Sequence, residues 1–317
     1  MNIINSKNAK IFLLLNSIFW GSSYIWAKML LSFIPRFAVL FICSVCAAIV
    51  TLIIFYKKLG RFSAKAVLIS ILVSLSSVLS NTFCMLALER TSGSNTAFIV
   101  QLSVVITPII MAFFNRKLPP LKTCLLALLS LIGIFFITLA GKGFTINLGD
   151  FFALLNAIFF SLFMALQNVI SRKVNAVQFT LIQHTTNSIS FLILGIAFSE
   201  FSKVSPHNLL STQFILLITL NTLVVIFTAL SQSKAISYVK PETAAILYTF
   251  EPVVTLFLGV LLLGEKYVGL FPIVGCALVL FSVVLSSIKL PHIKLPHIKK
   301  EAAGIYPATS YNFKHSS

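Results

Sequence analysis

Long apolar runs separated by short charged connections constrain this chain more than any other feature of its sequence. Hydrophobic residues make up 58% of the 317 residues and charged residues only 10%, with a mean hydropathy of +1.01. A soluble fold of this length could not solvate such a surface. Windows of about 20 apolar residues, the length of a transmembrane helix, can be placed at residues 11–32, 34–56, 66–88, 94–114, 121–141, 149–170, 179–199, 212–233, 242–263 and 267–288. We therefore predict an all-α integral membrane protein with ten transmembrane helices, because backbone groups in lipid must be satisfied internally.

An internal repeat indicates that the windows form two related halves. Residues 14–21, LLNSIFWG, return about 140 residues later at 154–161 as LLNAIFFS, and each copy opens a long apolar run. The repeat continues in pairs of related positions about 148 residues apart: 87–88 with 235–236, 95–97 with 243–245, and Pro108 with Pro252. Because five spans is an odd number, the second half must enter the membrane in the opposite orientation. We predict an inverted repeat of five plus five helices.

The distribution of positive charge predicts how the chain crosses the membrane. If the N-terminus is cytoplasmic, 18 of the 24 Lys and Arg residues lie in inner segments and six in outer ones. The positive-inside rule then places both termini in the cytoplasm. The net charge of +17 reports this topology and attraction to anionic lipids rather than a nucleic-acid partner. The expected units are a cytoplasmic N-terminus (1–10), two five-helix repeats (11–141 and 149–288) and a basic, disordered cytoplasmic tail (289–317).

Three motifs resemble the EamA group of the drug/metabolite transporter superfamily, and the likeness covers about residues 11–288. Residues 20–23, WGSS, resemble the family's W-G-S-N opening, residues 95–98 with 104–108 resemble its fourth span, and residues 251–254 with 263–265 resemble its ninth span and ending. The resemblance implies a basket of ten helices around a central substrate cavity, with spans 5 and 10 at the periphery. It also implies transport of small organic metabolites, often outward.

Of the seven acidic residues in the sequence, Glu251 is the one that falls in mid-membrane. It lies about ten residues, or roughly 15 Å, into its window, where a polar group is costly and usually functional. Pro252 cannot donate a backbone hydrogen bond, which leaves the Tyr248 carbonyl unpaired, and Pro108 does the same for Val104. Paired helix breaks near the midplane indicate a binding site in inverted-repeat transporters. The alternative is that Glu251 is a protonated structural residue bonded to a neighbouring helix.

Helical spacing nominates companions for Glu251 in substrate binding or coupling. Tyr248 and Thr255 share its face at i−3 and i+4, and Gln101 lies at a comparable depth in the fourth window. Other polar faces carry Asn16, Trp20, Asn81, Asn156 and Gln167. A stripe of small polar residues in the third window, from Ser70 to Cys84, favours close helix packing over a substrate role. His184 is predicted near the inner membrane interface.

The chain offers little for a cofactor or a metal. Cys43 and Cys46 have C-x-x-C spacing but fall inside an apolar window, so we interpret them as small apolar residues. The sequence has no G-x-x-x-x-G-K-[ST] segment, so ATP is not the direct energy source. We expect no cofactor and no metal site. The expected partners are a small-molecule substrate, the lipid bilayer and protons, with a homodimer as the candidate assembly.

The substrate class follows from the charges that the spans lack. Where the family's second span usually carries an arginine, this chain has Cys43 and Ser44, and no Lys or Arg falls deep in any window. A phosphate would therefore find no partner charge. We predict a secondary transporter, an exporter of amino acids or their derivatives in a bacterial plasma membrane. The alternative is a non-transporting membrane protein of similar architecture, such as a lipid-modifying enzyme or a sensor.

Overall fold

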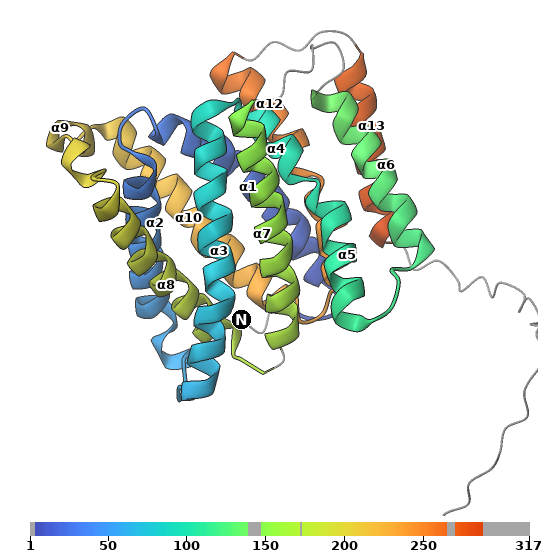
Figure 1. Cartoon of the computed structure of the whole chain (residues 1–317), viewed down its shortest axis with the longest axis horizontal. Helices are drawn as coiled ribbons and strands as arrows, with labels where there is room; N and C mark the ends of the chain where they lie inside the picture. Colours follow the sequence, from blue (N-terminus) through green and yellow to red (C-terminus); the bar gives the residue numbers. More distant parts are fainter. Residues whose placement is uncertain (1–3, 139–146, 172, 265–269, 288–317) are drawn as a thin grey trace, which may run out of the picture. The chain divides into compact units, whose positions relative to one another are not determined.

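The computed structural model describes residues 4–138, 147–171, 173–264 and 270–287, and helices with short connections make up all of this part of the chain (Figure 1). The predicted tail (289–317) and Glu265 of the ninth-span motif lie outside the described residues. The helices are α1 (Ala9–Leu30), α2 (Arg36–Phe55), α3 (Ala64–Arg90), α4 (Gly93–Val100), α5 (Ser103–Asn115), α6 (Leu121–Thr138), α7 (Leu148–Ile170), α8 (Ala176–Ala197), α9 (Pro206–Leu209), α10 (Thr212–Ala235), α11 (Pro241–Tyr248), α12 (Glu251–Leu263) and α13 (Phe271–Ser287). Two short 3₁₀ turns, η1 (Tyr56–Lys58) and η2 (Phe201–Lys203), lie in connections.

Six helical segments of the described chain are long and apolar enough to cross a membrane, when the pairs α4–α5 and α11–α12 are each taken as one segment. Two shorter apolar helices, α6 and α13, accompany them. α1 and α8 have 22 residues each but are not among the six, because polar side chains lower their mean hydropathy. Large apolar side chains such as Ile53, Phe113 and Phe257 are exposed on the helices, as contact with lipid requires. The prediction of an all-α multi-pass membrane protein is confirmed, and the count of ten spans stays a prediction.

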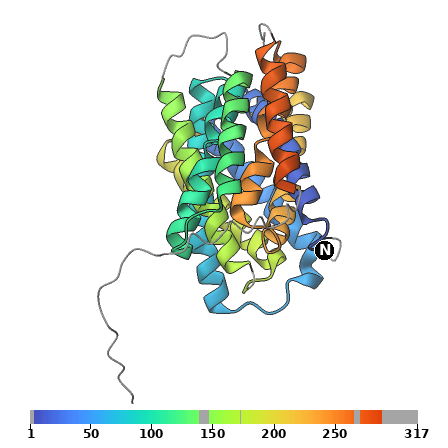
Figure 2. The same cartoon turned by 90° about the vertical axis from the view of Figure 1, so that its right-hand side faces the viewer.

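Helices of one half pack against helices of the other half, and each such contact recurs with the two halves exchanged. α3 packs on α7 as α10 packs on α1, while α2 packs on α8 and α6 packs on α13 (Figures 1 and 2). In the same way, α4 and α5 contact α7, whereas α11 and α12 contact α1. Each contact therefore recurs with the halves exchanged, which is the pattern that a two-fold relation produces. The α6–α13 pair lies at one side of the helices described here, joined by the Ser130 and Ser282 hydroxyls at 2.8 Å.

Two helices are broken at equivalent places in the two halves. α4 and α5 are separated at Gln101 and Leu102, and α11 and α12 are separated at Thr249 and Phe250. The offset is 148 residues in both pairs, from Gly93 to Pro241 and from Ser103 to Glu251. At each break the N–H groups bond to carbonyls three residues back, as in Leu102 to Ile99 at 3.0 Å and Phe250 to Leu247 at 3.4 Å. The chain thus tightens into 3₁₀ geometry and starts a new helix.

The prediction that Pro108 marks the break of its helix is wrong. Pro108 lies inside α5, seven residues after Gln101, and the 148-residue offset makes Val104 the position related to Pro252. A proline disturbs only the turn before it, so Pro108 affects the first turn of α5 and leaves the break itself to other residues. Pro252 does follow its break directly, in the first turn of α12, where its missing N–H costs no helical hydrogen bond.

An ion cluster ties the start of α2 to the ends of α3 and α8. Arg36 pairs with Glu89 at 2.6 Å and with Glu200 at 3.1 Å, and the Phe37 N–H donates to Glu200 Oε2 at 2.8 Å. Glu200 therefore acts as an N-terminal cap for α2 in addition to its ion pair. Its side chain is 5% exposed, against 25% for Glu89. All three charged residues belong to segments predicted to lie on the outer side.

Glu200→Ala should lower the free energy of unfolding by about 2 kcal/mol, because the substitution leaves the Phe37 N–H without its acceptor and removes a buried partner from Arg36. Glu89→Ala, at the more exposed end of the cluster, should cost about 1 kcal/mol or less. Thermal unfolding of both variants in detergent measures the difference. Equal effects of the two substitutions would contradict the capping role of Glu200.

Candidate functional site

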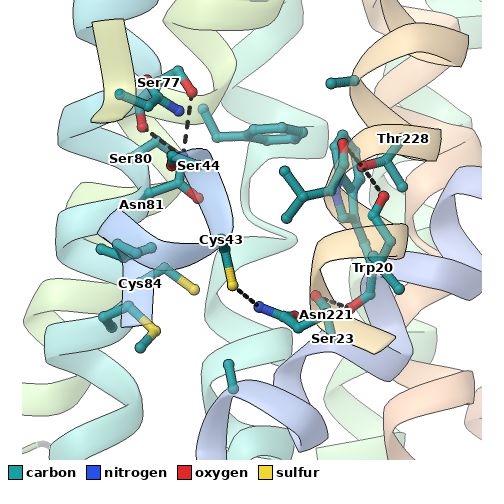
Figure 3. Close-up of a pocket in the computed structure, with 18 of the residues that line it drawn as sticks. Trp20, Ser23, Cys43, Ser44, Ser77, Ser80, Asn81, Cys84, Asn221 and Thr228 are labelled. Carbon is teal, nitrogen blue, oxygen red and sulfur yellow. Dashed lines mark hydrogen bonds between the residues drawn. The ribbon is translucent and has the colours of Figure 1, made fainter. Parts of the chain in front are cut away.

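A cavity of about 180 Å³ lies among the helices of the two halves. Its walls come from α1, α2, α3 and α4 of the first half and from α7, α8, α10 and α12 of the second. Figure 3 shows part of these walls, with Ser77, Ser80 and Asn81 of α3 on one side and Trp20 of α1 with Thr228 of α10 on the other. Polar atoms in an apolar bundle are thus gathered around one internal space, the usual arrangement of a small-molecule site.

Glu251 enters the cavity wall from the first position of α12 and is 2% exposed. Its Oε2 accepts a hydrogen bond from Gln101 Nε2 at 3.0 Å and one from the Tyr24 hydroxyl at 3.4 Å. Gln101 is the residue at which α4 ends, so this bond joins the two helix breaks directly. The start of α12 also favours a carboxyl group electrostatically, because unpaired N–H groups and the helix dipole point toward it. The mid-membrane carboxyl and its predicted partner Gln101 are therefore brought together.

A close helix crossing holds the backbone of Glu251 in place. A Cβ atom added to Gly21 of α1 would lie 2.6 Å from the Glu251 carbonyl oxygen and 2.8 Å from Val254 Cβ, closer than atoms tolerate. The Thr255 hydroxyl lies within hydrogen-bonding distance of the Gly21 and Glu251 carbonyl oxygens, at 2.9 and 3.0 Å. Thr255 does share the face of Glu251, but it is used in the contact between α1 and α12 and is not one of the residues lining the cavity. The structure gives Thr255 a packing role, and its predicted role in substrate binding or coupling stays a prediction.

Four of the other predicted site residues line the cavity: Trp20, Asn81, Asn156 and Gln167. Asn156 accepts a hydrogen bond from the Ser80 hydroxyl at 2.7 Å, which connects α7 to α3. Gln167 accepts one from Gln232 Nε2 at 2.7 Å, which connects α7 to α10. Their amides are thus held in fixed orientations at the wall.

Tyr248 and Asn16 lie one layer behind the wall, which differs from the sequence prediction. The Tyr248 hydroxyl donates to Gln232 Oε1 at 2.9 Å, and its ring packs edge-on against Trp20 at 4.9 Å. Asn16 bonds to the Thr228 carbonyl at 3.2 Å and to the Ser231 hydroxyl at 2.5 Å, between α1 and α10. Helical spacing placed these residues on polar faces, but those faces meet a neighbouring helix before they reach the cavity. Both residues orient groups that do line it.

The small-polar stripe of α3 divides between packing and the cavity. The Ser70 and Ser74 hydroxyls bond to carbonyls four residues back, as side chains in a tight helix contact do. Ser77, Asn81 and Cys84, further along the same helix, line the cavity instead. The packing interpretation therefore holds for the first part of the stripe alone.

Sequence reasoning missed Tyr24 and a polar face of α8. Tyr24 follows Trp20 by four residues, so the face of α1 that contains Trp20 could have indicated it. His184 was predicted at the membrane interface, but its side chain is 1% exposed and lines the cavity together with Gln183 and Asn187. The spacing i, i+1 and i+4 of these three residues is the sequence signal that indicates this face. Cys43 was interpreted as apolar, yet its sulfur lies 3.3 Å from Asn221 Nδ2 at the cavity wall (Figure 3).

The charge of the cavity is set by Glu251. The described residues that line the cavity include no Lys and no Arg. Within the described ranges, no group of three or more His, Cys, Asp and Glu residues could hold a metal ion. The site can therefore neutralise a positive group of a ligand, but it offers no fixed positive charge to a phosphate or carboxylate.

Apolar helices packed around a buried polar cavity define an integral multi-pass membrane protein. The model of the EamA-like transporter family matches residues 7–139 and 147–288, so the chain belongs to this family. It is similar to an uncharacterized transporter of Archaeoglobus fulgidus, with 27% identity over 205 residues that cover 63% of this chain and 64% of that relative's length. A protein solved by crystallography shares the fold, with a TM-score of 0.74 at 16% identity over 89% of this chain and 98% of that one. The chain is therefore an integral multi-pass membrane protein of the EamA-like transporter family.

Gly21→Ala should reduce transport per folded molecule by about tenfold or more, because the added methyl group pushes α12 and Glu251 away from α1. Gly133→Ala is the matched control: its Cβ would lie 2.9 Å from the Gly275 carbonyl in the α6–α13 contact, which contributes no residue to the cavity. Melting temperature and transport rate are measured for both. We expect both variants to melt earlier and only Gly21→Ala to lose transport. Equal losses of transport would show that the crossing matters for stability alone.

Proposed function

We propose that the protein is a secondary transporter that exports small organic metabolites, such as amino acids or their derivatives, by alternating access around the cavity. The observation that carries the proposal is the hydrogen bond between Gln101 and Glu251, which places the breaks of both halves at one buried polar site. Broken helices that meet at a cavity between two repeats are the usual binding site of such transporters. An enzyme would need a nucleophile together with an acid and a base, whereas the partners of Glu251 are an amide and a phenol.

The proposed mechanism uses two related halves that rock against each other. Contacts such as α3 on α7 and α10 on α1 recur with the halves exchanged, so two arrangements of similar free energy are available to the same set of helices. Glu251 exchanges a proton or binds a positive group of the substrate, and the tyrosine and glutamine that donate to it hold the carboxyl group in place. Because the chain has no phosphate-binding loop, a gradient rather than ATP supplies the energy.

In the proposed topology, ten spans form an inverted repeat in the bacterial plasma membrane, and both termini are cytoplasmic. The 18 to 6 division of basic residues supports this orientation. The cluster of Arg36, Glu89 and Glu200 agrees with placing these three residues on one side of the membrane, because they meet in space. A homodimer is the proposed assembly.

Vesicles that contain only this protein should show saturable transport without ATP, and Glu251→Gln should make that transport slow and insensitive to pH. Glutamine keeps the shape of the side chain but cannot exchange a proton or neutralise an amine. Glu89→Gln, in the ion cluster away from the cavity, is the control and should keep the parental pH profile. Rates are measured over a pH series alongside melting curves. Parental rates and affinity for Glu251→Gln at every pH would leave Glu251 as a structural residue.

Reporter fusions should place residues 60 and 300 on the cytoplasmic side and residue 207 on the outer side. The expectation follows from the density of Lys and Arg in the segments that contain the first two positions. Fusions with a reporter active only in the cytoplasm and one active only outside give the two readouts at each position. Residues 60 and 300 on opposite sides would contradict an even number of spans between them.

A further inference from the structure

Three residues of α8 that line the cavity have buried side-chain atoms with no hydrogen-bond partner in the described part of the chain. These atoms are Gln183 Oε1, Asn187 Oδ1 and both ring nitrogens of His184. Gln183 is 7% exposed, Asn187 6% and His184 1%. Among the described residues, all buried side chains that both line the cavity and have such an atom come from α8. Native proteins leave few buried polar atoms unpaired, since each costs about 1–3 kcal/mol.

The orientation of Gln183 follows from its other hydrogen bond. Its Nε2 donates to the Ser77 hydroxyl of α3 at 3.2 Å, which leaves the carbonyl oxygen as the unpartnered end. Neutral histidine has one acceptor and one donor nitrogen, and the Asn187 amide has an acceptor oxygen and a donor nitrogen. The α8 face is therefore polar and without charge when His184 is neutral, and the Gln183 oxygen is an acceptor that has no partner.

Glu251 stands on a different wall of the cavity. α12 packs mainly against α1, α4 and α6, whereas α8 packs mainly against α2, α3 and α10, so the main packing partners of the two helices differ and the helices lie on opposite sides (Figure 1). Both hydrogen bonds to the Glu251 carboxyl group end on Oε2, and none within the described chain ends on Oε1. The cavity thus has a carboxyl group at one wall and, when His184 is neutral, a polar face without charge at the other.

We propose that the substrate is a small organic cation whose amine binds Glu251 and whose other end is uncharged and donates hydrogen bonds to Gln183, His184 and Asn187. This inference rests on the transport function proposed above and narrows it to amino-acid derivatives whose carboxyl group is replaced by an amide or a similar donor. A free carboxylate would find no Lys or Arg among the described residues of the cavity wall, and it would approach the Gln183 carbonyl oxygen on α8. Burial of such a charge without a partner is strongly unfavourable.

Three ligands that differ at one group test the proposal with the purified full-length protein: leucine, leucinamide and 3-methylbutylamine. Calorimetric titration gives their affinities, and counterflow in vesicles shows whether they are carried. We expect leucinamide to bind roughly 100-fold more tightly than leucine, which corresponds to about 3 kcal/mol of unfavourable carboxylate burial. The amine, which lacks the donor end, should bind with intermediate affinity.

Two variants test which wall of the cavity binds which end of the ligand. Gln183→Met combined with Asn187→Leu removes the acceptors with little change of volume, so the advantage of leucinamide over the amine should disappear while the amine still binds better than leucine. Glu251→Gln should reduce the advantage of the amine over leucine. Thr51→Val is the control, because its hydroxyl is also buried and unpartnered but Thr51 does not line the cavity. It should keep the parental order of affinities.

Leucine binding as tightly as leucinamide would overturn the proposal. So would an unchanged order of affinities in the Gln183→Met, Asn187→Leu variant when its melting curve is that of a folded protein. If none of the three ligands binds, the substrate class is wrong. Saturable transport of another solute by the same vesicles would then leave the proposed transport function standing, and the absence of any transport would remove that function as well.

Discussion

The 3.0 Å hydrogen bond between Gln101 and Glu251 is the contact on which the arrangement of the site depends. It joins the end of α4 to the start of α12, so each broken helix supplies a partner for the break of the other half. Hydrogen bonds to a carboxyl group contribute about 1.5–3 kcal/mol when the group is charged, and they are strongest where water is excluded. The Tyr24 hydroxyl adds a second donor from α1. Three helices thereby converge on one side chain.

Small residues make this convergence sterically feasible. Gly21 lets the α1 backbone pass over the first turn of α12, and Gly133 does the same for α6 against α13. Between helices in lipid, close backbone approach and polar contacts replace the hydrophobic effect as the source of association. The hydroxyls of Thr255 and of the Ser130–Ser282 pair follow this principle, because each bonds across such a contact. A glycine and a hydroxyl hydrogen bond thus stabilise the contact between α6 and α13, and the same combination positions Glu251 at the contact between α1 and α12.

α8 illustrates the opposite use of polar residues. Its glutamines, histidine and asparagine lower its mean hydropathy, so α8 is not among the six long apolar segments, although the apolar window 179–199 overlaps it. Neighbouring helices α2, α3 and α10 shield these side chains from lipid. A helix with this composition is stable only inside a bundle, where other helices cover its polar face. Polar residues at such a position usually serve a functional site rather than the stability of the fold. The polar residues that make the composition of α8 unusual include three that line the cavity.

The sequence by itself determined the helical segments, the family, the relation of the halves and Glu251 with its partner Gln101, because hydropathy, helical spacing and repeated motifs are local properties of the chain. Only the tertiary structure decided which polar faces reach the cavity. Trp20 and Asn156 do, whereas Asn16, Tyr248 and Thr255 are used in contacts between helices. The tertiary structure also decided that Val104 rather than Pro108 is related to Pro252, and that His184 is buried. Spacing along one helix defines a face, but the rotation and crossing of its neighbours decide what that face meets.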